Sequence, residues 1–224
     1  MSVELKLKTL TPAEIAEVTG GTLEIYGNID AGEEIRYVTH NSKETGDGVL
    51  FCAIKGQRAD GNDFLPEAIE AGSRCFLCNR VPDAAKDQAF AKPFCAVVVP
   101  DTVQAMGTLG AYYRGFSKAK FIAITGSVGK TTTKEFVYAV ASAAFKTHKT
   151  RGNLNSEIGL PLTLFDLSPD DEVSVLEMGM SALGEIEHMT KIVRPDIAIV
   201  TNIGTSHLAS LGTRENICRA KMEI

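Results

Sequence analysis

The chain has 224 residues, of which 44% are hydrophobic and 23% are charged, with 20 glycines and 8 prolines. This ordinary globular composition provides for two domains of ~100 residues, each with its own core, and excludes collagen-like and disordered low-complexity chains. The formal net charge is −5. An acidic chain of this kind lacks the clustered cationic surface needed to hold nucleic acid by its phosphates, so no nucleic-acid partner is expected.

Two further features of the sequence concern the compartment. No stretch approaches the ~20 consecutive apolar residues of a membrane helix, and MSVELKLKTL does not resemble a secretory signal. The cysteines are odd in number and scattered, which favours the cytoplasm. Cys75 and Cys78 spell CxxC within an apolar run, and residues three apart on a strand face opposite sides, so we expect both to be buried rather than to bind metal.

The first hundred residues read as a small α/β domain. Thr11 can cap a helix that has Pro12 at its first position, Glu14 completes a capping box, and Gly20 can end the helix. Short apolar runs predict strands, and one segment between them is helix-like: the runs are 48–54, 74–78 and 95–99, and the segment is 64–72. We place this domain at residues 1–99.

The second domain, residues 100–224, alternates buried strands with amphipathic helices. Apolar runs predict strands at 121–125, 173–177 and 197–201, and helical patterns occupy 101–114, 131–145 and 184–193. In the middle helix, the apolar side is expected to hold Phe136, Val137, Val140 and Ala144. This alternation predicts a doubly wound, mostly parallel sheet.

A phosphate-binding loop is predicted between the strand at 121–125 and the helix that follows. Glycines allow backbone N–H groups to surround phosphates, the helix N-terminus adds partial positive charge, a lysine neutralises the terminal phosphates, and a hydroxyl directly after it can bind Mg²⁺. The residues are Gly126, Ser127, Val128, Gly129, Lys130, Thr131 and Thr132. The loop departs from G-x-x-x-x-G-K-[ST], because Ile124 stands where the first glycine belongs. A simple Gly-Ser turn is the alternative, and the flanking strand and helix argue against it.

Polar residues follow the other predicted strands of this domain. Glu177 ends one strand, where carboxyl ends line the ligand crevice of a parallel sheet and a carboxylate can hold Mg²⁺. His207 comes after the strand at 197–201 and a glycine. Asn153 and Asn155 lie in a glycine-rich loop, where their amides can donate to and accept from a polar ligand.

Together these segments resemble the Mur ligases. The segments are TGSVGKTTTKE, GNLNSEIGLPLTL, LEMGMSALGEI, RPDIAIVTNIGTSHL and RENICRAKMEI, in that order, and the earlier DGVLFCAIKGQRADGNDFLPEAIEAG resembles the family's N-terminal UDP-binding domain. The resemblance covers nearly the whole chain. GNLNSEIG and EMGMSALGEI favour the branch of the family that adds D-Ala-D-Ala.

The resemblance implies a cytoplasmic, monomeric, ATP- and Mg²⁺-dependent amide-bond ligase of peptidoglycan synthesis, which acts in cell wall formation, cell shape and division. Its partners would be UDP-MurNAc-tripeptide and D-Ala-D-Ala. The peptide carboxylate would attack the γ-phosphate of ATP to give an acyl phosphate, and the amine of D-Ala-D-Ala would displace phosphate. Mg²⁺ and a lysine would cancel charge so that two anions can meet.

Roles carry over by position from this resemblance. Lys130 would hold the β- and γ-phosphates, Thr131 and Glu177 would bind one Mg²⁺, and His207 would serve a second metal. Lys221, which by itself looks like a solvated helix lysine, matches the family lysine that becomes N-carbamylated and so would be both catalytic and metal-binding. Asn153 and Asn155 would lie near the diphosphate or acyl end of the UDP substrate. Ser42, Lys55 and Asp63 would address the uridine nucleotide, although HNSK departs from the family's DSR-like pattern at Asn41 and Lys43.

Several alternatives remain open. The family's central domain continues past the Lys221 motif and a further domain follows it, so we expect this chain to be an incomplete form that does not ligate alone. Cyanophycin synthetase and folylpolyglutamate synthase share the loop, but the resemblance to the UDP-binding domain argues against a folate enzyme. A non-catalytic nucleotide-binding or regulatory module could dispense with Glu177, His207 and Lys221, so their joint presence favours an enzyme.

Overall fold

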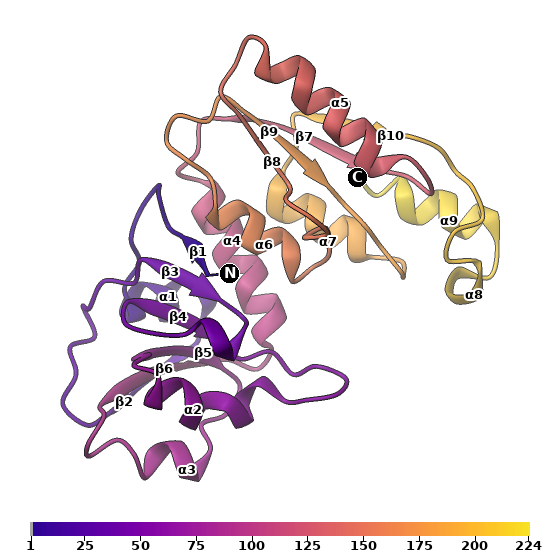
Figure 1. Cartoon of the computed structure of the whole chain (residues 1–224). Helices are drawn as coiled ribbons and strands as arrows, with labels where there is room; N and C mark the ends of the chain where they lie inside the picture. The colour runs from indigo at the N-terminus through magenta and orange to yellow at the C-terminus, as the bar shows by residue number, and fades with distance from the viewer. Residues whose placement is uncertain (1) are drawn as a thin grey trace. The chain divides into compact units, whose positions relative to one another are not determined.

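The computed structural model describes residues 2–224 and divides the chain into two compact units, 1–112 and 113–224 (Figure 1). The domain boundary predicted after residue 99 stays a prediction; helix α4 (Thr102–Arg114) lies mostly in the first compact unit. Tyr112 on this helix donates a hydrogen bond of 2.5 Å to Glu14 in α1 (Pro12–Thr19). Within residues 2–224 no helix has the length and apolarity to cross a membrane.

The first unit is a six-stranded sheet with short helices. Its strands are β1 (Val3–Glu4), β2 (Thr22–Tyr26), β3 (Tyr37–Thr39), β4 (Val49–Cys52), β5 (Cys75–Cys78) and β6 (Phe94–Val98). Besides α1, its helices are α2 (Leu65–Glu70), α3 (Asp83–Lys86) and the 3₁₀ turns η1 (Ser42–Glu44) and η2 (Gly61–Phe64). The sheet order is β1-β3-β4-β5-β6-β2, in which β3 to β6 run parallel and the two edge strands are antiparallel.

Aromatic rings form the core on one face of this sheet. Phe51 and Phe76 on neighbouring strands meet edge-on with their centroids 6.3 Å apart, and Phe76 meets Phe94 at 5.5 Å. Leu65 and Ile69 of α2 pack on the same cluster. Such offset contacts between buried rings stabilise the domain beyond their buried area.

At the N-terminus of α1, only one of the two hydrogen bonds of the predicted capping box is formed. The Thr11 side chain accepts the Glu14 N–H at 3.2 Å, and Gly20 ends the helix in the left-handed region with φ 68°. The reciprocal half of the expected capping box is absent from the described contacts, because the Glu14 carboxylate instead accepts from Lys8 and Tyr112.

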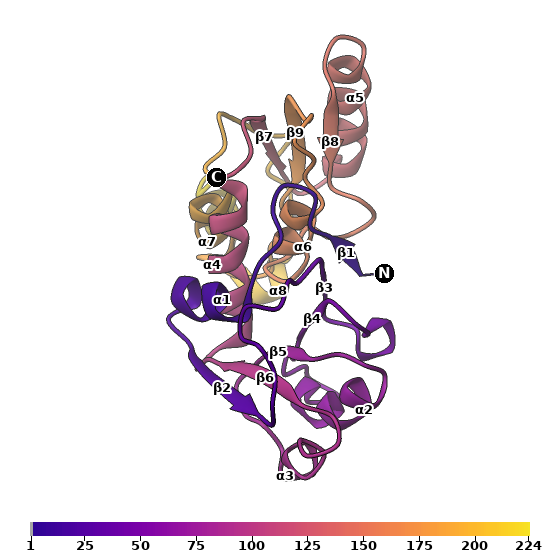
Figure 2. The ribbon, with the colours of Figure 1, turned by 90° about the vertical axis from the view of Figure 1, so that its left-hand side faces the viewer.

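The second unit is a three-layered α/β structure. Its strands are β7 (Lys120–Thr125), β8 (Thr147–Lys149), β9 (Val173–Glu177) and β10 (Ile197–Val200). Its helices after α4 are α5 (Lys130–Ser142), α6 (Gly159–Phe165), α7 (Glu185–Val193), α8 (Leu208–Leu211) and α9 (Arg214–Lys221). The order β10-β7-β9-β8 is parallel throughout, and α5 covers one face while α6 and α7 cover the other (Figures 1 and 2). The predicted doubly wound sheet is confirmed.

The buried side of α5 differs from the expected one. Phe136 and Val140 are 69% and 75% exposed, whereas Val137 and Ala141 pack against the sheet. Lys134 shares this inner side, being three residues before Val137 and seven before Ala141, and is 2% exposed. Of the four residues expected on the apolar side, only Val137 packs against the sheet, and the expectation overlooked a lysine that faces it.

Candidate functional site

The loop after β7 begins with a backbone position that admits only glycine. Gly126 has φ 148°, and a Cβ atom added there would lie 1.9 Å from the Thr201 hydroxyl, just beyond β10. This close approach allows the loop to turn tightly over the carboxyl ends of two neighbouring strands. The glycine that the sequence identified is therefore required by geometry.

Residues just after β10 hold the phosphate loop in shape. The Ser127 and Val128 N–H groups donate to the backbone and side-chain oxygens of Asn202, at 3.1 and 3.0 Å. The Thr201 hydroxyl donates to the Val128 carbonyl at 2.7 Å. Neither Asn202 nor Thr201 is among the candidate residues predicted above, although IAIVTN places both at the carboxyl end of an apolar run.

The N-terminus of α5 is open to an anion. Gly129 occupies the cap position with φ 84°, and no side chain caps the helix. The first N–H groups of a helix lack intrahelical partners and carry partial positive charge, so a phosphate can take the place of a cap. Thr131 and Thr132 lie exposed in this first turn.

Two lysines from distant parts of the chain converge on this loop. The Lys130 and Lys221 ammonium groups both donate to the Gly126 carbonyl, at 2.8 and 3.0 Å. Lys221 is 1% exposed at the end of α9, and its burial, with Lys130 close by, lowers its pKa to about 8. Two adjacent cations repel each other, and a polyanion such as a phosphate chain would relieve this repulsion.

Glu177, at the end of β9, faces the same loop. Its carboxylate accepts the Thr131 hydroxyl at 2.9 Å and the Asn155 amide at 2.8 Å, and the residue is 3% exposed. Carboxylate and hydroxyl oxygens are the ligands that Mg²⁺ prefers, so Thr131 and Glu177 fit a magnesium ion beside bound phosphates. The side chain of Asn155, predicted near the UDP substrate, lies on the Glu177 carboxylate.

Two predicted residues of this unit are not brought to the cluster. His207 is exposed in the loop before α8, with φ 62°, and within residues 2–224 no hydrogen bond or ion pair joins its side chain to Lys130, Thr131 or Glu177. Asn153 is likewise exposed, and its carbonyl accepts the Asn155 N–H at 2.8 Å. Across the described residues no three His, Cys, Asp or Glu side chains form a metal site. The roles predicted for these residues remain predictions.

The predicted uridine residues lie beyond the carboxyl ends of strands in the first unit. Ser42 begins η1 after β3, and Lys55 is exposed after β4, which is the edge where parallel sheets bind ligands. Asp63 forms an ion pair with Arg80, which also forms an ion pair with Asp60 at 3.1 Å. Arg80, which the sequence did not suggest, thus holds the loop that contains Lys55 against the end of β5.

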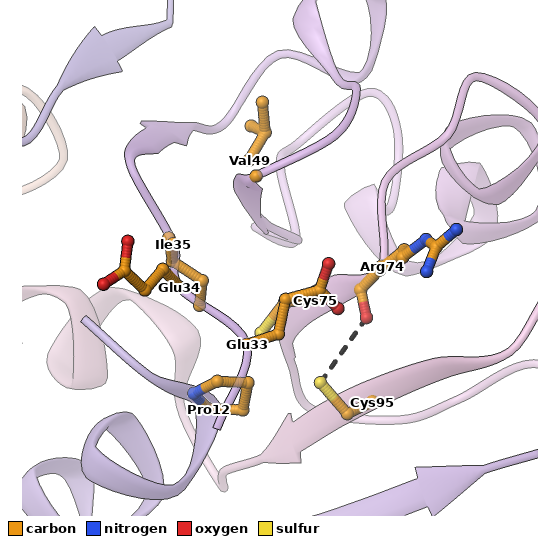
Figure 3. A pocket seen from close by; sticks show the side chains of 9 residues that line it. Pro12, Glu33, Glu34, Ile35, Val49, Arg74, Cys75 and Cys95 are labelled. Atoms are coloured by element: carbon orange, nitrogen blue, oxygen red, sulfur yellow. Dashed lines mark hydrogen bonds between the residues drawn. The ribbon is translucent and has the colours of Figure 1, made fainter. Parts of the chain in front are cut away.

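A small pocket in the same unit lies at the opposite edge of its sheet (Figure 3). Its lining includes Gly48 and Arg74, which directly precede β4 and β5, together with the thiols of Cys75 and Cys95. The Cys95 thiol donates to the Arg74 carbonyl at 3.4 Å. Because it lies at the amino ends of the strands, this pocket is separate from the predicted nucleotide-binding edge.

Comparison with known proteins gives two family matches that together cover most of the chain. Residues 34–114 match the catalytic domain model of the Mur ligase family, and residues 124–224 match the Mur ligase middle domain.

Curated relatives carry the name UDP-N-acetylmuramoyl-tripeptide–D-alanyl-D-alanine ligase. The Bacillus subtilis protein is 40% identical and the Escherichia coli protein 34% identical, each over 96% of this chain and 45% of the relative. The chain thus spans about half the length of these relatives.

Solved structures agree. A crystal structure of MurF from Acinetobacter baumannii matches 97% of this chain and 46% of its own, with 37% identity and a TM-score of 0.88. MurF ligase from Thermotoga maritima in complex with ADP matches 84% of this chain and 42% of its own, with 37% identity and a TM-score of 0.75. The matched domains, the motif of the phosphate loop and these relatives together show that the chain belongs to the Mur ligase family.

Proposed function

We propose that this chain forms the nucleotide-handling part of an ATP-dependent ligase that joins D-Ala-D-Ala to UDP-MurNAc-tripeptide in peptidoglycan synthesis. The observation that carries the proposal is the convergence of Lys130 and Lys221 on the Gly126 carbonyl, beside the Thr131–Glu177 pair. Two cations, an uncapped helix N-terminus and a buried carboxylate around one loop are the parts that a metal-bound triphosphate needs.

The chain's own residues would act by placing positive charge beside the phosphates of ATP. Lys130 and the first N–H groups of α5 would hold the β- and γ-phosphates of ATP, and Thr131 and Glu177 would hold Mg²⁺, which neutralises the phosphate oxygens. The carboxylate of the UDP-linked peptide attacks the γ-phosphorus, and the bond to ADP breaks. The amine of D-Ala-D-Ala then attacks the acyl carbon of the resulting acyl phosphate, loses a proton and releases phosphate.

Lys221 would act as a carbamate in this scheme. Addition of carbon dioxide to its amine, with loss of a proton, replaces a cation by an oxygen-bearing anion that can approach Mg²⁺. Its burial against the phosphate loop, 3.0 Å from the Gly126 carbonyl, supports this role. His207 would serve a second metal.

The first unit would bind the UDP end of the substrate. Ser42, Lys55 and Asp63 lie beyond the carboxyl ends of β3 and β4 or in the loop that Arg80 holds there, while Asn153 and Asn155 would meet the diphosphate or acyl end. We also propose a monomer that works in the cytoplasm and, with a formal net charge of −5, binds no nucleic acid.

Nucleotide binding tests the proposal directly. We expect this chain to bind Mg·ADP in isothermal titration calorimetry, and Lys130→Ala to weaken binding about tenfold or more, since a charge-assisted contact with phosphate is lost. Lys146→Ala removes a surface lysine that pairs with Asp170 and should leave binding unchanged. Absence of binding by the unchanged chain, or full binding by Lys130→Ala, would contradict the proposal.

A further inference from the structure

Lys134 is a lysine that the proposed chemistry does not use, yet it is almost completely buried. It lies one turn after Lys130 on α5, with 2% of its side chain exposed. Burial of an ammonium group costs several kcal/mol unless charged or polar partners replace water, so a lysine in this position must be matched by its surroundings.

Its partners come from two neighbouring segments of the sheet and from its own helix. The ammonium donates to the Thr150 carbonyl at 3.0 Å, just after β8, and lies 3.9 Å from a Glu177 carboxylate oxygen at the end of β9. Glu135, the next residue of α5, lies 3.3 Å away. Lys134 therefore links α5 to the ends of two strands.

Thr150 makes this link cooperative. While its carbonyl accepts from Lys134, its hydroxyl accepts the Glu177 N–H at 3.0 Å, and its own N–H donates to the Val175 carbonyl. The backbone of Glu177 is thus fixed by Thr150, and one oxygen of its carboxylate, Oε2, faces both Thr131 and Lys134. Any shift of α5 against the sheet would alter the distance between Thr131 and Glu177.

We propose that Lys134 is a positioning residue: it sets the orientation of the Glu177 carboxylate, and the spacing of Glu177 from Thr131, for a metal-bound nucleotide. The inference rests on the proposed function, in which Thr131 and Glu177 hold Mg²⁺. Groups that orient a metal ligand commonly change metal affinity by about 10–100-fold when they are replaced.

A purely repulsive role would give the opposite result. A cation 3.9 Å from a metal ligand also repels the incoming Mg²⁺. If repulsion prevailed, removal of the charge would tighten the binding of Mg·ADP. If positioning prevails, removal of the charge weakens it, so the sign of the change distinguishes the two roles.

The test compares ADP binding by calorimetry with Mg²⁺ and with EDTA. Lys134→Met keeps the length and apolar stem of the side chain, and we expect it to reduce the gain in ADP affinity from Mg²⁺ about tenfold while affinity in EDTA changes little. Lys134→Gln, a second uncharged variant, should act in the same direction, and Lys134→Arg, which keeps the charge, should restore part of the gain.

Two further variants separate positioning from a general structural effect. Lys149→Met is the matched control, because Lys149 also pairs with Glu135 but is not paired with Glu177 among the described contacts. In a Glu177→Gln background, Lys134→Met should cause no further loss of the Mg²⁺-dependent gain, as expected for residues that act through one another.

The outcomes are distinct. No binding by the unchanged chain would overturn the proposed function and this inference together. If the unchanged chain binds normally, the inference alone would be overturned by a Lys134→Met variant in which Mg²⁺ raises ADP affinity as much as in the unchanged chain, or more. It would also be overturned if Lys149→Met lost as much of this Mg²⁺-dependent gain as Lys134→Met, or if the losses from Lys134→Met and Glu177→Gln were additive in the double variant.

Discussion

Gly126 combines two constraints, a positive φ and contact with a neighbouring strand end. With φ 148° and a would-be Cβ 1.9 Å from the Thr201 hydroxyl, Gly126→Ala must strain the backbone and displace Thr201. We expect a loss of about 1–3 kcal/mol in the free energy of unfolding in urea, followed by circular dichroism. Mg·ADP binding should also weaken, because Thr201 holds the Val128 carbonyl.

Gly46→Ala is the matched control for this change. No atom lies within 4 Å of the Cβ that alanine would add there. We expect its unfolding free energy to stay within about 0.5 kcal/mol of the unchanged chain. Equal stability of the two variants would show that the geometry of Gly126 is not restrictive.

The cysteines differ sharply in their expected reactivity. Burial raises the pKa of the Cys52 thiol and raises the pKa of the Cys78 thiol to about 12, whereas the contact with Cys95, followed by burial, raises the pKa of the Cys75 thiol. A raised pKa leaves little thiolate, which is the reactive form. Cys218 is the partly exposed cysteine.

We therefore expect one fast thiol in a reaction with Ellman's reagent at pH 8. Cys218→Ser should remove the fast phase, and the remaining thiols should react only after the chain is unfolded in guanidinium chloride. A fast phase that survives in Cys218→Ser would contradict the burial of the strand cysteines, including the two that line the pocket in Figure 3.

At the scale of elements, continuous apolar runs predicted most of the longer strands of both sheets, including the edge strand β10 (IAIVT), and missed strands that have no such run. FIAIT and VSVLE became β7 and β9, which have a strand on either side. The strands β2 and β8 escaped prediction because neither has a continuous apolar run: TLEIY alternates polar and apolar residues, and THK is polar throughout.

The candidate site could be predicted where backbone geometry and residue type coincide. Gly126 and Glu177 lie at strand ends, Lys130 donates to the Gly126 carbonyl, and Glu177 accepts from Thr131, so the predicted residues lie close together while their roles stay predictions. Lys134 could not be found in this way, because a lysine within TTTKEF reads as solvated until its spacing to Val137 and Ala141 is compared with the packed side of the helix.

A substitution at Asn202 shows how strongly a residue outside the phosphate loop stabilises the conformation of that loop. Asn202→Ala removes the acceptor for the Val128 N–H, a bond of 3.0 Å. One such hydrogen bond contributes about 1 kcal/mol, so we expect Mg·ADP binding to weaken about fivefold and amide exchange at Val128 to become faster. Asn28→Ala, in an exposed loop of the first unit, should change neither quantity. Unaltered exchange at Val128 would mean that Asn202 does not hold the loop.

At the scale of the whole molecule, the two units divide the proposed work between a nucleotide site and a UDP-substrate site. The second unit holds the Lys130, Lys221 and Glu177 cluster among its own elements, so we expect nucleotide binding to need no residue of the first unit. Binding of Mg·ADP and completion of an amide bond should therefore be separable properties.

Ligation by the 224 residues alone is the sharpest test of that separation. The relatives that carry the ligase name are matched over only 45% of their length, and bringing the amine of D-Ala-D-Ala to an acyl phosphate requires contacts that orient it. We expect no phosphate release from ATP, UDP-MurNAc-tripeptide and D-Ala-D-Ala, measured by a coupled phosphate assay, in a sample that binds Mg·ADP. Release at rates of about 1 s⁻¹ or more, abolished by Lys130→Ala, would instead show that the cluster around Gly126 and the first unit suffice to bring both reactants together.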